Sequence, residues 1–175
     1  RNAQADWKGR PRSNDTHAST TDPDARSYRK SHNTAALLCY QGHALMENCN
    51  GVVVSAVVTH ADGLGERRAA VAMLDALPGT SGRRSVGADK AYGTADFVVA
   101  CRERNVTPHI ASNDTRVGGS AIDGRTTRHP GYRLSQIVRK RVEEHFGWGK
   151  TICRIRQTVF RGLRRVDQQF KLTLT

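Results

Sequence analysis

Two runs of apolar residues, 36–45 and 52–59, open the patterned part of the chain. Both are rich in residues that favour strands, and the polar segment between them contains Asn50-Gly51, a pair typical of tight hairpin turns. The pattern therefore predicts a β-hairpin over these residues.

The segment before the hairpin has a different pattern. It is rich in Asn, Asp, Ser, Thr, Arg and Lys, has only isolated apolar residues, and includes the turn sequence Asp22-Pro23-Asp24. Such a segment buries too little apolar surface to fold alone. We expect residues 1–34 to form a polar arm or linker and residues 35–175 to form one domain.

Helices and short strands alternate after the hairpin. Residues 66–77 have apolar side chains at helical spacing, and Pro78-Gly79 then ends the helix. Residues 84–88 predict a short strand. Thr94 is expected to cap a further helix that ends near Asn105.

The rest of the chain predicts one more strand and two helices. Residues 106–110 form the strand, in which Pro108 cannot donate a ladder hydrogen bond and therefore favours a sheet edge. A long polar loop over residues 111–131 precedes the longest helix, over residues 132–150, and a basic helix runs from Gly162 to the end. Strands of mixed direction with intervening helices predict an α/β fold, a mixed sheet flanked by helices.

Charge is distributed unevenly along the chain. It has 28 Lys and Arg against 16 Asp and Glu, a net charge of +12, and residues 124–175 alone carry a net charge of +10. This excess predicts contact with a polyanion. Because only 10 residues are aromatic, duplex phosphates are favoured over stacked single-stranded bases. The alternative interpretation is a solvated charged surface.

Other features limit the class of protein. No window reaches the ~18 consecutive apolar residues of a membrane span. The chain starts with Arg1 and without the apolar core of a signal peptide, so we expect it to be a piece of something longer. Its four cysteines lack the paired spacing of a zinc knuckle or a disulfide framework, which is typical of a soluble protein in a reducing cytosol.

One candidate for chemistry is Asp89, which follows the predicted strand and precedes Lys90-Ala91-Tyr92-Gly93. A carboxylate at the carboxyl end of a strand, beside a flexible turn, is well placed to bind a metal ion. The alternative is an aspartate that only accepts hydrogen bonds from turn amides.

A second candidate lies on the long predicted helix. At about 100° per residue, Glu143 borders the apolar stripe of this helix, whereas Glu144 points to solvent. Arg139 and Lys150 then share the face of Glu143. An ordinary surface ion pair between residues four apart is the alternative.

Six stretches of the chain are informative when taken together. They are residues 19–26, 42–48, 61–63, 88–92, 122–132 and 139–150. They resemble bacterial insertion-sequence transposases of the DDE type, and the last one resembles the Arg-x3-Glu-x6-Lys signature around the final catalytic acid of that family. The resemblance covers nearly the whole chain and implies an RNase H-like fold, as in DDE transposases and integrases.

The resemblance also implies roles for individual residues. Asp89 matches the second acid of the DDE triad and Glu143 the third, while Arg139 and Lys150 match the flanking basic residues. The implied reaction is DNA strand cleavage and strand transfer with two Mg²⁺ or Mn²⁺ ions, which Asp89 and Glu143 would bind. Arg139 and Lys150 would hold phosphate oxygens.

The first acid of the triad has no match in the chain. The family places it on a strand upstream of the polar arm, and Asp22 and Asp24 lie in a turn instead, so neither is assigned to it. We therefore expect a fold that is incomplete at the N-terminus and a chain that is truncated at both ends and catalytically inactive by itself.

The expected partner is double-stranded DNA at the transposon ends. We expect contacts with its phosphates from the basic residues beyond the catalytic helix, Arg154, Arg156, Arg161, Arg164 and Arg165. The resemblance further implies a homodimer as a candidate assembly and a cytoplasmic location at the bacterial nucleoid. A non-catalytic basic module that binds double-stranded DNA or RNA is the alternative, but it gives no reason for Asp89 or for the Arg139, Glu143 and Lys150 signature.

Overall fold

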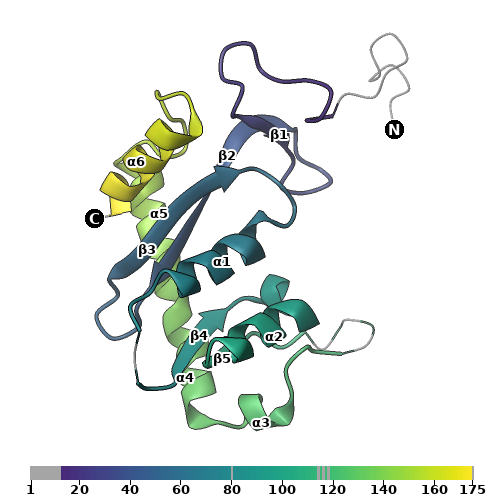
Figure 1. The fold of residues 1–175 in the computed structure, drawn as a ribbon, viewed down its shortest axis with the longest axis vertical. Coiled ribbons are helices and arrows are strands. Elements are labelled where there is room, and N and C mark those ends of the chain that lie inside the picture. Colours follow the sequence, from purple (N-terminus) through teal and green to yellow (C-terminus); the bar gives the residue numbers. More distant parts are fainter. Residues whose placement is uncertain (1–12, 80, 114, 116, 118, 175) are drawn as a thin grey trace.

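The structure is a computed structural model that describes residues 13–79, 81–113, 115, 117 and 119–174. In chain order its elements are β1 (Arg26–Tyr28), β2 (Leu37–Met46), β3 (Val53–His60), α1 (Gly65–Asp75), β4 (Arg84–Ala88), the 3₁₀ turn η3 (Lys90–Tyr92), α2 (Ala95–Glu103), β5 (Val106–Ile110), α3 (Gly124–Thr127), α4 (Pro130–Val138), the 3₁₀ turn η4 (Arg139–Arg141), α5 (Val142–Thr151) and α6 (Leu163–Leu174) (Figure 1). The first 12 residues of the predicted arm, and parts of the predicted 111–131 loop, lie outside the described residues.

The strands form two sheets. One is antiparallel with the order β1-β2-β3, and the other is the parallel pair β4 and β5. The predicted hairpin is confirmed, because β2 and β3 pair from Tyr40 opposite His60 to Met46 opposite Val53. Gly51 in the connecting turn has φ +79°, a backbone conformation that glycine adopts without strain. The prediction of mixed strand directions is also confirmed.

The two sheets differ from the one continuous sheet that the sequence suggested. Among the described residues no strand joins β2 to β4. As predicted from Pro108, β5 is an edge strand, pairing only with β4 within the described residues.

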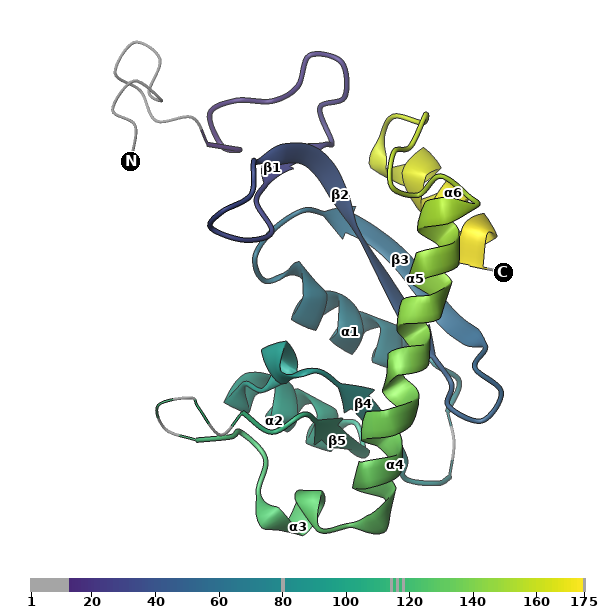
Figure 2. The same cartoon turned by 180° about the vertical axis from the view of Figure 1, so that it is seen from behind.

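Helices cover both faces of the antiparallel sheet, with α1 on one face and α6 on the other (Figures 1 and 2). Val58 of β3 and the α6 residues Val166, Phe170 and Leu174 form one buried core. The approach of α6 is close, since a Cβ atom on Gly42 of β2 would lie 2.7 Å from the Phe170 ring. A glycine is therefore required where this helix crosses β2.

A second core lies against the parallel pair. Phe97, Val98 and Cys101 of α2 pack with Ile110 of β5 and with Leu74 of α1, so α1 contributes to this core while it covers the hairpin. The predicted cap is confirmed, because the Thr94 hydroxyl accepts the Phe97 N–H at 3.4 Å. All four cysteines are free thiols, and Cys101 is buried in this core.

The prediction of a single long helix over residues 132–150 is wrong in detail. Helix α4 begins earlier, at Pro130, because His129 caps it by accepting the Gly131 N–H at 3.1 Å. A 3₁₀ turn, η4, then separates α4 from α5. The polar loop before it is also not purely a loop, since the Asp123 carboxylate caps the short helix α3.

Candidate active site

Asp89 follows the last residue of β4 and starts the turn η3. Its Oδ1 accepts the N–H of Ala91 at 2.8 Å, which satisfies one of the free amides at the start of the turn. The side chain is exposed, and the bond to Ala91 uses one oxygen. The carboxylate therefore makes the turn hydrogen bond that we considered as an alternative, and it keeps an oxygen that faces no described donor.

The turn after Asp89 is held from two sides. Arg67 of α1 donates from Nη1 to the carbonyl of Ala91 at 3.2 Å, and the Tyr92 ring packs on Phe97 of α2 with centroids 5.2 Å apart. Burial, followed by the negative charges of Glu66 and Asp89, raises the pKa of Tyr92 to about 12. The turn that begins at Asp89 is therefore held by contacts with both α1 and α2.

Arg139 lies directly on the strand that ends at Asp89. A Cβ atom on Gly87 would be 3.2 Å from the Arg139 Cβ and 3.2 Å from the Ser135 carbonyl oxygen, so the helix and the strand are in close contact here. The guanidinium Nε donates to Oε1 of Gln136 at 2.9 Å, which orients the side chain. Arg139 therefore contacts β4 at Gly87, two residues before Asp89.

Glu143 follows η4, in the first turn of α5. The surface ion pair with Arg139, which we considered as the alternative, is absent among the salt bridges of the described residues. Glu143 and Glu144 are both exposed, so burial does not distinguish them as the helical-face prediction required. The 3₁₀ turn η4 changes the assumed angle between Arg139 and Glu143, whereas Glu143 and Glu144 both lie in α5, after this turn. Lys150 is exposed, with Nζ 5.9 Å from the centroid of the Phe146 ring.

Helices α4 and α5 form a nearly straight column that passes from the parallel pair to the hairpin (Figure 2). At its start, the Tyr132 hydroxyl donates to the carbonyl of Ile110 at 2.9 Å on β5. The middle contacts β4 at Gly87, and further along the His145 ring contacts the carbonyl of Gly51 in the hairpin turn, with Nε2 and oxygen 2.8 Å apart. Glu143 therefore lies between the contact with β4 and the contact with the hairpin.

Asp22 and Asp24 serve the C-terminal helix. Asp22 Oδ1 accepts the N–H of Gly162 at 3.1 Å, and Asp24 Oδ2 accepts the N–H of Leu163 at 2.9 Å. The Tyr40 hydroxyl also donates to Asp22, at 2.7 and 2.8 Å from its two oxygens. These two carboxylates cap α6, a role that the sequence did not reveal, and their engagement is consistent with leaving the first acid unassigned.

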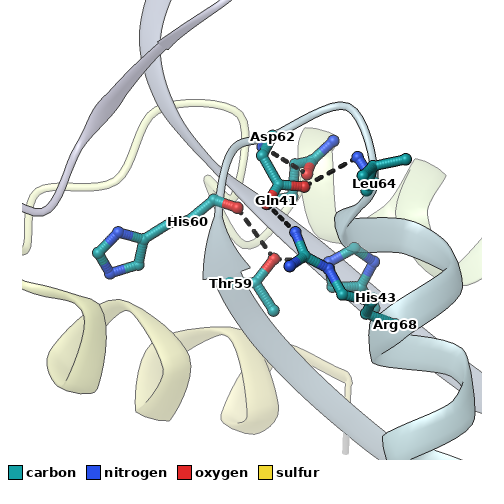
Figure 3. A network of polar contacts seen from close by, with 7 residues as sticks. All are labelled: Gln41, His43, Thr59, His60, Asp62, Leu64 and Arg68. Carbon is teal, nitrogen blue, oxygen red and sulfur yellow. Dashed lines mark hydrogen bonds and ion pairs between the residues drawn. The ribbon is translucent and has the colours of Figure 1, made fainter. Parts of the chain in front are cut away.

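A polar network fixes the start of α1 on the hairpin (Figure 3). Asp62 accepts the N–H of Leu64 at 2.9 Å and forms an ion pair with Arg68 (Figure 3). Burial opposes ionisation of this carboxyl, but its hydrogen bonds outweigh burial and hold the pKa of Asp62 below its usual value. Beneath it, the Thr59 hydroxyl donates to the His60 carbonyl and accepts from Nε2 of buried His43 at 2.9 Å (Figure 3).

The basic segment after α5 is open to solvent. Its five arginines are exposed and take part in none of the salt bridges between described residues: Arg154, Arg156, Arg161, Arg164 and Arg165. Two of them lie in the first turn of α6, where positive charge opposes the helix dipole and the Asp22 and Asp24 carboxylates counter it. These guanidinium groups remain available to an external anion.

The donor chemistry at Asp89 and Glu143 fits a divalent metal ion. Both are exposed carboxylates, the hard oxygen ligands that Mg²⁺ and Mn²⁺ prefer. Within the described residues, no cluster of three or more His, Cys, Asp or Glu side chains is arranged to hold a metal. The same part of the chain contains no helix with the length and apolar character needed to cross a membrane.

Comparison with known proteins supplies the family. No curated protein and no solved structure matches the chain. The family model described as the transposase DDE domain, whose members carry out DNA transposition with divalent metal ions, matches residues 14–175. This match does not favour a non-catalytic binding module, and it agrees with the mixed α/β architecture of an RNase H-like domain. Because the match spans nearly the whole chain, the protein belongs to the DDE transposase family.

Proposed function

We propose that this chain contributes Asp89 and Glu143 to a centre that binds Mg²⁺ or Mn²⁺ and acts in cleavage and transfer of DNA strands at transposon ends. The observation that carries the proposal is the contact of Arg139 with Gly87. It holds the helix that bears Glu143 against the strand that ends at Asp89, although 54 positions separate the two acids in the sequence.

Each residue has a distinct part in this proposal. Bound divalent ions would activate the attacking oxygen and stabilise the leaving oxygen of the phosphodiester. Asp89 and Glu143 supply carboxylate oxygens to hold the ions. Arg139, oriented by Gln136, and Lys150 donate to the phosphate oxygens and so orient the scissile group.

The duplex is held through the basic segment that follows α5. Exposed arginines there bind phosphates without reading the base sequence. The proposal includes a homodimer as the assembly on DNA and, because the partner is duplex DNA, a location at the bacterial nucleoid. The negative charge of the duplex and the positive charge of the segment are opposite in sign, as binding requires.

Metal-directed cutting of the polypeptide tests whether the two acids share a metal. Fe²⁺ with ascorbate is added to the full chain in place of Mg²⁺, and the hydroxyl radicals formed at the metal cut the backbone nearby. We expect cuts near residue 89 and near residue 143, both suppressed by excess Mg²⁺. Fragments are identified by mass spectrometry.

Variants make the outcome decisive. Asp89→Asn should remove the cuts at both places, because one shared site produces them, and Glu143→Gln should do the same. The matched control is Glu144→Gln, which changes the neighbouring glutamate and should leave the cuts unchanged. Cuts confined to one of the two segments, or unaffected by Asp89→Asn, would refute the shared centre.

A further inference from the structure

A cavity of about 570 Å³ opens on the parallel β4–β5 pair, away from Asp89 and Glu143. Four guanidinium groups line it: Arg83, Arg84, Arg102 and Arg125. The remaining lining residues are neutral or histidine, and no Asp or Glu is among them. Convergence of like charges without a counter-ion is unfavourable, so this lining is complementary to an anion.

Most of these guanidinium groups lack partners. Arg84 donates to the carbonyl of Pro78. Within the described residues, the guanidinium groups of Arg83, Arg102 and Arg125 make neither a hydrogen bond nor an ion pair. Arg104, two positions from Arg102, differs from these arginines because its guanidinium has a carboxylate partner.

Arg104 forms a two-pronged pair with Asp75, with Nε to Oδ1 at 2.6 Å and Nη2 to Oδ2 at 3.0 Å. The chain therefore supplies a carboxylate to one arginine at this end of α2 and leaves its neighbour Arg102 exposed at the cavity. Planar guanidinium groups that are exposed and have no carboxylate partner can bind phosphate oxygens through paired hydrogen bonds.

The floor of the cavity is rigid. His109 is buried, and its Nδ1 lies 2.7 Å from the Ser135 hydroxyl. Its ring packs edge-on against Tyr132 at 5.8 Å, and the Gln136 side chain donates to its carbonyl oxygen. The arginines therefore surround a preformed surface.

The cavity is distinct from the catalytic edge of the strands. It includes Arg84 and Val106, which pair at the amino ends of β4 and β5, whereas Asp89 follows the pair of Ala88 and Ile110 at the carboxyl ends. Four residue steps at about 3.3 Å each put these two ends roughly 13 Å apart. The cavity also reaches His109, opposite Gly87, but its arginines lie at the start of β4 and on α2 and α3. A phosphate held by these arginines is therefore distinct from the one proposed to react at Asp89.

We propose that this cavity, called here the arginine cavity, binds a backbone phosphate of duplex DNA at a second contact outside the catalytic centre. DNA as the ligand rests on the proposed function, and the phosphate chemistry rests on the cavity itself. The contact adds to those of the basic segment after α5 and places duplex on the α2–α3 side of the parallel pair.

The test measures binding of a labelled duplex of about 20 base pairs to the full chain. Fluorescence anisotropy reports the binding over a range of salt concentrations with EDTA present. Each phosphate contact contributes about 0.9 to the slope of log K against log salt. The double variant Arg102→Gln/Arg125→Gln should lower that slope by about 0.9, because the cavity holds one phosphate. The control is Arg133→Gln, an exposed arginine of α4 outside the cavity, which should leave the slope unchanged.

Fold and charge are checked separately. Arg102 and Arg125 are exposed and unpaired in the described residues, so the double variant should melt at the wild-type temperature. Arg102→Lys/Arg125→Lys keeps the charges and should restore most of the slope. A double variant with the slope of the Arg133→Gln control overturns the proposal.

Inorganic phosphate distinguishes a small anion from DNA. It is titrated against the thermal midpoint at constant ionic strength, with wild type and double variant side by side. Stabilisation of the wild type alone, together with an unchanged duplex slope, would mean a free-phosphate site and overturn the DNA contact. Because these readouts need no metal, failure here is separable from failure of the metal centre.

Discussion

Gly87 and Arg139 touch so closely that no side chain fits between them. A Cβ atom on Gly87 would lie 3.2 Å from the Cβ of Arg139, tighter than ordinary van der Waals contact. One residue belongs to the strand that ends at Asp89 and the other to the turn that precedes Glu143. The absence of a side chain at position 87 therefore sets the separation of the two segments that carry the proposed catalytic acids.

Enlarging residue 87 should push the helical column away from β4. We expect Gly87→Val to lower the free energy of unfolding by about 1–3 kcal/mol, the usual cost of overpacking, and Gly87→Ala to lower it by less. Metal-directed cutting near residue 143 should weaken more than cutting near residue 89. Urea unfolding and fragment mapping measure the two effects.

Gly147 provides the matched control for this substitution. It lies in α5, and nothing is within 4 Å of a Cβ atom built on it. Gly147→Ala should stabilise the protein by roughly 0.5–1 kcal/mol, because alanine is the better helix former. Equal losses at positions 87 and 147 would contradict the contact argument.

The sequence predicted those elements that depend on local pattern. The two apolar runs on either side of Asn50-Gly51 identified the hairpin, and Thr94 marked the start of α2. Asp89 was correctly placed at the end of a strand. Local patterns are sufficient for these features because each is determined by residues close to one another in the chain.

Features that depend on distant residues were missed. Asp24 and Leu163 are 139 positions apart, and no local pattern indicates that one caps the other. The 3₁₀ turn η4 interrupts the assumed continuous helix between Arg139 and Glu143. Glu143 and Glu144 are both exposed, so the predicted difference between them does not appear as a difference in burial. The arginine cavity likewise combines residues from α2, α3 and the start of β4.

Removing the cap of α6 should destabilise the fold measurably. Asp24→Ala leaves the Leu163 N–H without its acceptor at the start of α6. This helix contributes three buried residues to one of the two cores. We expect a loss of about 1 kcal/mol, within the usual range of 0.5–2 kcal/mol for a lost N-cap. The comparison is with Asp15→Ala, an exposed aspartate, which should change the urea midpoint little.

Stability should decrease as the solution becomes acidic. Burial lowers the pKa of His43, against the opposing effect of Asp62, and burial together with the charge of His129 lowers the pKa of His109. The unfolded chain then binds more protons than the folded chain below about pH 6.5, the ordinary histidine value. Stability is therefore fully present above this pH and falls as the pH drops toward the lowered folded values.

Urea midpoints at pH 8, 7, 6 and 5.5 measure this dependence. His43→Gln should flatten the curve, because glutamine can donate to Thr59 but does not take up a proton. His32→Gln, at an exposed position, should keep the wild-type curve. A wild-type midpoint that rises between pH 7 and 5.5 would show that the two buried histidines are not the groups that control it.

The 175-residue chain by itself should bind duplex DNA without cutting it. In-line displacement between two metal ions needs a set of ligands that Asp89 and Glu143 do not fill alone. Asp22 and Asp24, the acids nearest to the polar arm's end, are engaged as caps of α6. We therefore expect no nicking of supercoiled plasmid with Mg²⁺ or Mn²⁺, although the same preparation binds duplex DNA in a salt-dependent manner. Metal-dependent nicking that disappears in Asp89→Asn would mean that another acid of this chain completes the site, and Asp22→Asn and Asp24→Asn, assayed beside it, would identify whether a capping aspartate is that acid.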